Sequence, residues 1–189
     1  MSRIALAQAL FEESSTLLII PPAQYNDVIA TVPKRLQGKS VCYVTLNKTY
    51  NALVEVFERE QVDLSSFVFI DAITKSIGKV ENKETCYFVS SPQALTELSI
   101  VMAEFLEYAF DYVIVDSLTT LLIYQKSEEP VLKFLSNMLN KIKKSGAKSI
   151  FYVVNVDDHK QLIQQASMIL DEVVDLESTE LSDSIEYHS

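Results

Sequence analysis

Short, continuous apolar runs alternate with longer stretches of helical period along almost the whole chain. Such runs are typical of strands buried on both faces, as in a parallel sheet that is covered by helices. The predicted strands are residues 16–20, 40–46, 67–72, 85–90, 112–117, 149–154 and 172–176. The alternation therefore predicts an α/β fold with three α/β/α layers and a mostly parallel central sheet.

Two of the intervening stretches predict long amphipathic helices. Pro92 is expected to open one helix and Pro130 lies near the start of another, since proline suits the first helical turn. Gly146 is expected to end the second helix after a lysine-rich last turn. The apolar stripes of the two helices are Leu95, Leu98, Val101, Met102, Phe105 and Leu106, and Val131, Phe134, Leu135, Met138, Leu139 and Ile142.

The length of 189 residues fits a single domain with a substantial core. We assign residues 1–177 to this domain and residues 178–189 to a flexible acidic tail. The apolar runs are too short to span a bilayer, and Glu12 and Glu13 interrupt the start before a signal-peptide core develops. We therefore expect a cytoplasmic protein without membrane insertion.

The charge balance disfavours anionic partners. With 26 acidic and 16 basic residues, the net charge of -10 repels phosphate backbones, so we expect no nucleic-acid partner. Cys42 and Cys86 both lie inside apolar segments, which predicts buried, reduced thiols rather than a disulfide or a metal site.

The tripeptide Gly38-Lys39-Ser40 has the letters with which a phosphate-binding loop ends. Such a loop follows a strand and opens a helix, with glycines that let backbone N–H groups surround a phosphate. Here the order is reversed, because the tripeptide follows a predicted helix and leads into a predicted strand. We interpret it as a glycine turn and not as a nucleotide site.

The place where a phosphate loop belongs is the turn after the first predicted strand. That turn begins with Pro21 and Pro22, which remove two N–H donors where a phosphate would need them. No lysine follows before Lys34. The turn can begin a helix, but it cannot surround a triphosphate in the usual way.

The stretch "FDYVIVDSLTTLLIY" (110–124) resembles the acidic strand of RecA-like ATPases of the KaiC branch. Residues 88–106 are similar to the Ser-Pro-x-x-Leu-Thr-x-Leu-Ser helix entry of archaeal KaiC-like proteins. Residues 131–154 and 169–178 resemble their following helix, glycine turn, strand and closing strand. The resemblance implies a RecA-like fold, that of P-loop NTPases, here without the P-loop.

The resemblance also implies which residues would form a nucleotide site. Asp116 and Ser117 match the acidic strand that helps to hold Mg²⁺ in such ATPases. Asn47 and Lys48 stand where the KaiC-like pattern has catalytic glutamates. Phosphoryl transfer depends on positioning and electrostatics, so the loss of loop, lysine and base together argues against activity.

The sequence also allows other roles for these and other polar residues. Asp116 could hydrogen-bond to Thr119 or Thr120, or Lys48 could pair with Asp116. Asp71 ends another strand, but the first strand offers no acidic pair for a phospho-acceptor site. In the segment 156–161, Asp157 or Asp158 is expected to cap a helix rather than to bind a metal.

Three functions follow from the sequence, of which the last is an enzyme of unrelated chemistry that uses the crevice near Pro21, Asn47, Lys48 and Asp116. The first is a non-catalytic RecA/KaiC-like domain, without cofactor or metal, that regulates by binding protein partners. Those partners include a second copy of the chain or an active KaiC-like relative. The alternative is a protein that binds ATP or ADP without efficient hydrolysis in a rebuilt site at Pro21, Pro22, Asn47, Lys48, Asp116 and Ser117.

Overall fold

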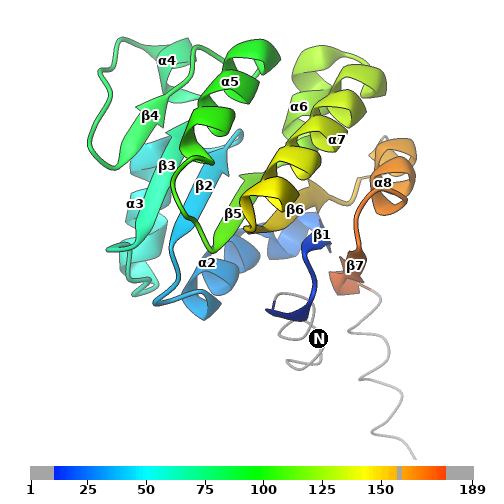
Figure 1. The fold of residues 1–189 in the computed structure, drawn as a ribbon, viewed down its shortest axis with the longest axis horizontal. Helices are drawn as coiled ribbons and strands as arrows, with labels where there is room; N and C mark the ends of the chain where they lie inside the picture. Colours follow the sequence, from blue (N-terminus) through cyan, green and yellow to red (C-terminus); the bar gives the residue numbers. More distant parts are fainter. Residues whose placement is uncertain (1–10, 157–158, 178–189) are drawn as a thin grey trace, which may run out of the picture.

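A seven-stranded sheet forms the centre of the molecule (Figure 1). The structure, a computed structural model, describes residues 11–156 and 159–177. The predicted tail at 178–189 and the predicted cap at Asp157 or Asp158 lie outside these residues. The strand order is β4-β3-β2-β5-β6-β1-β7, and every neighbouring pair is parallel.

All seven predicted strands are confirmed, with ends that differ by one or two residues. They form from continuous apolar runs because helices cover both faces of the sheet. Their bounds are β1 Ser15–Ile20, β2 Val41–Thr45, β3 Phe67–Asp71, β4 Cys86–Phe88, β5 Tyr112–Asp116, β6 Lys148–Val154 and β7 Glu172–Asp175.

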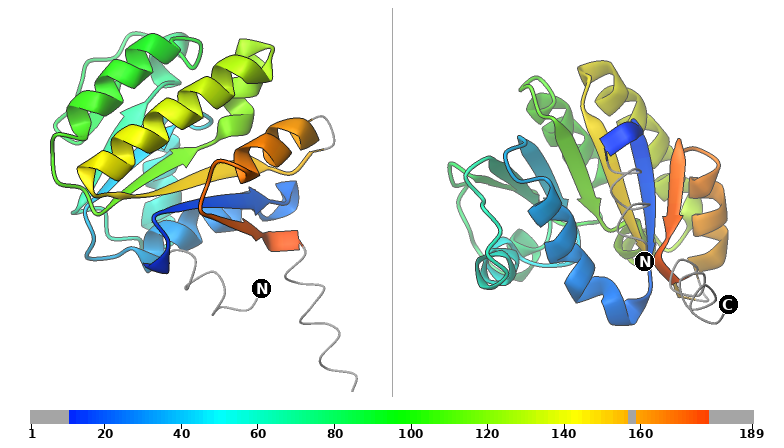
Figure 2. Two further views of the ribbon diagram at one scale, coloured as in Figure 1. Left: turned by 45° about the vertical axis from the view of Figure 1, so that its right-hand side comes forward. Right: turned by 90° about the horizontal axis from the view of Figure 1, so that it is seen from below.

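Two helical layers enclose the sheet, one on each face (Figure 2). One layer contains α2 (Tyr25–Arg35) and α3 (Tyr50–Arg59). The other contains α5 (Leu95–Phe105), α6 (Leu118–Gln125), α7 (Glu128–Ser145) and α8 (Lys160–Ser167). Two short helices, η1 (Pro22–Gln24) and α4 (Thr74–Ile77), lie at the carboxyl end of the sheet, after β1 and β3.

The core has two parts because successive side chains of a strand point to opposite faces. On β1, Leu17 and Ile19 pack under the α5–α8 layer, whereas Leu18 and Ile20 pack against α2 and α3. Burial of both sets of side chains stabilises the sheet from both sides. The three-layer architecture predicted from the sequence is therefore confirmed.

The structure corrects two details of the helices. Pro92 does not open α5, which begins at Leu95, because residues 92–93 form a turn and the Leu95 N–H donates to Gln93. Helix α6 was not predicted, since its short apolar sequence continues the pattern of β5. Gly38-Lys39-Ser40 forms a turn between α2 and β2, with Gly38 at φ 80°, which confirms the glycine-turn interpretation.

The outer edge of β4 is covered by the loop that precedes it. The Lys83 N–H donates to the Cys86 carbonyl, and the Cys86 N–H donates back to Lys83. The Asn82 side chain accepts from the Phe88 N–H at 3.0 Å. These bonds occupy edge groups of a three-residue strand that would otherwise be open to another chain.

Gly146 ends α7 in the left-handed conformation, at φ 82°. We expect Gly146→Ala to lower the free energy of unfolding by about 1 kcal/mol, because a Cβ is strained in this conformation. The matched control is Gly78→Ala, since Gly78 is extended and a Cβ there meets no atom within 4 Å. Equal unfolding free energies for the two variants in urea would contradict the prediction.

Candidate functional site

Asp116 ends β5 on the face of the sheet that α2 and α3 cover. Helix α2 starts after β1 and joins it to β2, so it crosses the sheet beneath β6 and β5. This path brings Tyr25, the first residue of α2, to the end of β5. The side chain of Asp116 is completely buried, with 0% of its surface exposed.

Two tyrosine hydroxyls donate to the Asp116 carboxylate. The Tyr25 hydroxyl lies 2.9 Å from Oδ1 and 2.8 Å from Oδ2. The Tyr43 hydroxyl, from β2, donates to Oδ2 at 2.8 Å. Both oxygens of the buried carboxylate therefore have a donor, as a buried anion requires.

The surroundings of Asp116 shift its pKa in opposing directions. Burial raises the pKa of Asp116 to about 6, because it disfavours the charged form. The hydrogen bonds from Tyr25 and Tyr43 and the positive charge of Lys48 lower it and so limit the rise. Burial also raises the pKa values of both tyrosines far above their ordinary range, so they remain donors at neutral pH.

A third tyrosine, Tyr152 on β6, completes the cluster. Burial and the charge of Asp116 raise the pKa of Tyr152 well above its usual value. Its hydroxyl is fully buried and has no hydrogen-bond partner within residues 11–156 and 159–177. Because Tyr43 and Tyr152 lie on the strands that flank β5, the acidic strand end is enclosed by aromatic side chains.

The turn after β1 is the short helix η1, entered at Pro21. Pro22 occupies its first position, and the Gln24 N–H donates to the Pro21 carbonyl at 2.9 Å. The turn therefore offers few free N–H groups, as the sequence indicated. The turn places Tyr25, whose hydroxyl donates to Asp116, at the end of β5.

Asn47 and Lys48 follow β2 and approach the same cluster. The Asn47 side chain acts on Tyr25 by opposing the rise in its pKa, and the Lys48 ammonium lies 5.7 Å from the centre of the Tyr25 ring. Lys48 acts on Asp116 by charge, but within the described residues it forms no ion pair with it. The Thr45 hydroxyl holds the loop through the Lys48 carbonyl at 2.5 Å.

The expected bond from Asp116 to Thr119 or Thr120 is wrong. Ser117 takes this place, since its hydroxyl lies 2.8 Å from that of Thr119 and 3.1 Å from that of Thr120. The Asp116–Ser117 peptide bond is cis. Ser117 therefore connects β5 to the first turn of α6.

The Asp71 side chain holds neighbouring elements of the fold together through hydrogen bonds. Its carboxylate accepts from the backbone N–H groups of Tyr50, Ile73 and Thr74, at 2.7, 2.6 and 2.8 Å. The Thr74 hydroxyl also donates to it. These bonds attach the end of β3 to the starts of α3 and α4.

Surface hollows lie away from the Asp116 cluster. One, of about 660 Å³, is lined by Lys75, Gly78, Lys79, Val80, Glu81 and Ser90. Another, of about 720 Å³, is lined by Glu128, Glu129, Leu132, Lys133, Ser136, Gln161 and Gln165. No residue of the Asp116 cluster lines either hollow.

Within the part of the chain that the structure describes, no three His, Cys, Asp or Glu side chains are grouped to hold a metal ion. Cys42 and Cys86 are free and buried, as predicted, and burial raises the pKa of each thiol to about 12. None of the described helices combines the length and hydropathy needed to cross a bilayer.

Comparison with known families identifies the domain. The family model described as "ATPase: KaiC" matches residues 33–187. The chain belongs to the KaiC ATPase family. The family match begins inside α2, so β1 and the Pro21–Pro22 turn lie outside the matched range.

A solved structure supports the fold of this KaiC-family chain. It is similar to the KaiC-like protein PH0186 from the hyperthermophilic archaeon Pyrococcus horikoshii OT3, with a TM-score of 0.61 and 12% sequence identity. The similarity covers 86% of this chain and 71% of the archaeal chain. At this identity the likeness shows the RecA-like fold alone. No curated protein sequence matches the chain.

Of the six residues that the sequence grouped, Asn47, Lys48 and Asp116 lie around Tyr25. Pro21 and Pro22 lie in the turn before Tyr25, and Ser117 hydrogen-bonds to α6. The sequence did not reveal Tyr25, Tyr43 and Tyr152 as site residues. Each tyrosine stands in or beside an apolar segment and looks like a core residue. Only the crossing path of α2 shows that the Tyr25 hydroxyl meets the same carboxylate as the Tyr43 hydroxyl.

Proposed function

We propose that this chain is a non-catalytic KaiC-family domain that acts through contacts with proteins. The observation that carries the proposal is the hydrogen bond of Tyr25 to both oxygens of the buried Asp116 carboxylate. The partner is a second copy of the chain, an active relative or another protein, and the role is regulatory.

Three features support this proposal. A carboxylate that helps to hold Mg²⁺ must face the phosphates and water, whereas Asp116 is sealed by tyrosine rings. The turn after β1 presents two prolines in place of a chain of N–H donors. Lys48, whose charge acts on Asp116, follows β2 rather than β1, so it does not start the helix at which a phosphate would bind.

We expect millimolar ATP, ADP or GTP with Mg²⁺ to leave the thermal unfolding midpoint of the purified protein unchanged. A ligand at 100 times its dissociation constant stabilises a fold by about 2.7 kcal/mol. For a domain of this size that corresponds to about 5–10 °C, which calorimetry detects easily.

The alternative function, binding of ATP or ADP without hydrolysis, predicts the opposite outcome. A midpoint that rises with nucleotide concentration, and that no longer rises in Asp116→Ala, would identify a rebuilt site and overturn the proposal. The matched control is Asp71→Ala, at a strand end whose carboxylate is occupied by backbone N–H groups.

A further inference from the structure

Helices α5 and α7 lie side by side on one face of the sheet (Figure 1). Each leads from the carboxyl end of the sheet to the start of the next strand, so the two helices run in the same direction. Their C-terminal ends therefore lie at the same end of the face. Their outward sides carry exposed side chains, since the buried residues of both helices point into the core.

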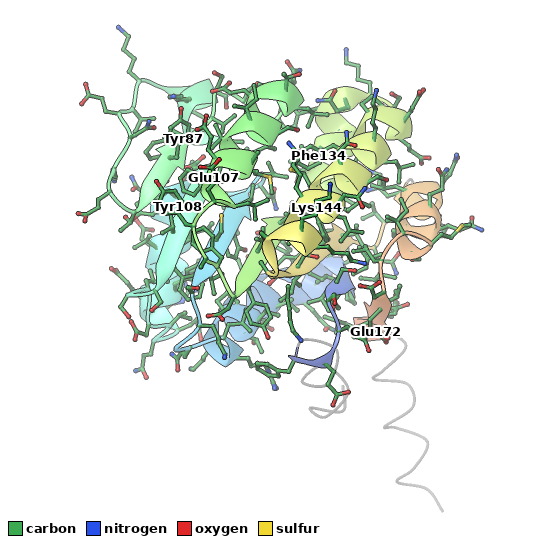
Figure 3. All side chains as sticks on the ribbon, in the orientation of Figure 1. Tyr87, Glu107, Tyr108, Phe134, Lys144 and Glu172 are labelled. Carbon is green, nitrogen blue, oxygen red and sulfur yellow. The ribbon has the colours of Figure 1, made fainter. Side chains whose placement is uncertain are left out.

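The C-terminal ends of the two helices carry opposite charges. Glu104 and Glu107 are exposed at the end of α5, and Lys141 and Lys144 are exposed in the last turns of α7. Within the described residues none of these four side chains forms an ion pair. Figure 3 shows Glu107 on the α5 side and Lys144 on the α7 side of the same face.

Exposed apolar side chains lie among the acidic residues of α5. Tyr108 is 69% exposed and Ile100 is 55% exposed. The ring of Tyr108 touches Phe105 edge-on, which leaves it accessible beside Glu107. An exposed aromatic ring next to carboxylates suits contact with a lysine, through cation–π attraction and packing of its aliphatic stem.

Two-fold symmetry makes this face complementary to itself. An axis parallel to the helices turns a second copy so that its α5 lies over α7 of the first, with the C-terminal ends matched. Each acidic helix end then meets the basic helix end of the other copy, so the same contact occurs twice, as an isologous interface requires. The charge pattern of one chain therefore fits a second copy of the same chain.

We propose that two copies of this chain associate through the α5–α7 face, with Glu104 and Glu107 of each copy against Lys141 and Lys144 of the other. This inference names the partner that the proposed function leaves open, and it rests on that proposed function. The net charge of -10 opposes association. At physiological ionic strength the Debye length of about 8 Å screens that repulsion more than it screens ion pairs in contact.

The test uses charge reversal in the full chain, followed by sedimentation equilibrium. We expect the wild type to dimerise, and Glu107→Lys or Lys144→Glu alone to raise the dissociation constant at least tenfold. Because each interface contains both contacts, an equimolar mixture of the two single variants should form a mixed dimer. The double variant Glu107→Lys/Lys144→Glu should dimerise as the wild type does.

The control variants are Glu58→Lys and Lys39→Glu, which reverse exposed charges elsewhere, on α3 and in the turn before β2. They should leave the dissociation constant unchanged, and circular dichroism of every variant checks the fold. A wild type that stays monomeric up to millimolar concentration overturns the proposal. So does a dimer that tolerates the single reversals. Neither outcome affects the nucleotide test, so the two proposals fail separately.

Discussion

Tyr43→Phe is expected to lower the free energy of unfolding by about 1.5–3 kcal/mol at pH 8, the usual range for a hydrogen bond to a charged group. The lost hydroxyl donates at 2.8 Å to a carboxylate that has no contact with solvent. Without it, Asp116 would depend on Tyr25 alone among the tyrosines. Urea denaturation followed by circular dichroism measures the change.

Tyr152→Phe is the matched control for this prediction. It removes the same hydroxyl group from an equally buried tyrosine of the same cluster, but this hydroxyl has no partner within the described residues. Removal of an unsatisfied buried group is expected to be neutral or stabilising. If both variants lose the same stability, the bond to Asp116 does not contribute as proposed.

Asp116→Asn is expected to gain about 3 kcal/mol of stability relative to the wild type between pH 4 and pH 7. The pKa of Asp116 is raised from 3.8 to about 6 in the folded protein, and each pKa unit corresponds to about 1.4 kcal/mol. A raised pKa in the folded state means that the protonated form is favoured there. In the wild type, the protonated Asp116 carboxyl therefore contributes in full to the free energy of unfolding below pH 3.8. This contribution is lost as the pH rises through 6.

The measurement is the difference in unfolding free energy between the two proteins at a series of pH values. Other acidic residues titrate in both proteins, so their effects cancel in the difference. A difference that stays constant from pH 4 to pH 7 would show that Asp116 ionises at its ordinary pKa. In that case burial does not raise the pKa of Asp116.

The fold could be predicted because its strands are continuous apolar runs, such as "TLLII" and "YVIV", that only a covered parallel sheet accommodates. Gly38 and Gly146 were also predicted correctly, since a positive φ favours glycine. Pro92 was misread because proline suits a turn as well as a first helical turn.

The candidate site could be predicted only in part. Asp116, Asn47 and Lys48 follow strands, and parallel strands present such positions at one edge of the sheet. The hydrogen bonds of Asp116 could not be predicted, because its donors come from Tyr25 and Tyr43, 91 and 73 residues away in the chain. Nor could the sequence show that, of the two neighbouring residues at the end of β5, Ser117 and not Asp116 hydrogen-bonds to α6.

The bond between Tyr25 and Asp116 also restricts the evolutionary changes that the chain can accept. A glycine-rich loop between Ile20 and Tyr25 would displace the tyrosine and leave the buried carboxylate with fewer donors, at a cost in stability. A lysine alone would still follow a turn that begins with two prolines. Substitutions in the turn and at Asp116 are therefore expected to be non-additive, because Tyr25 and Asp116 are in contact. The bond therefore couples the sequence of the turn after β1 to the stability of the buried carboxylate at the end of β5.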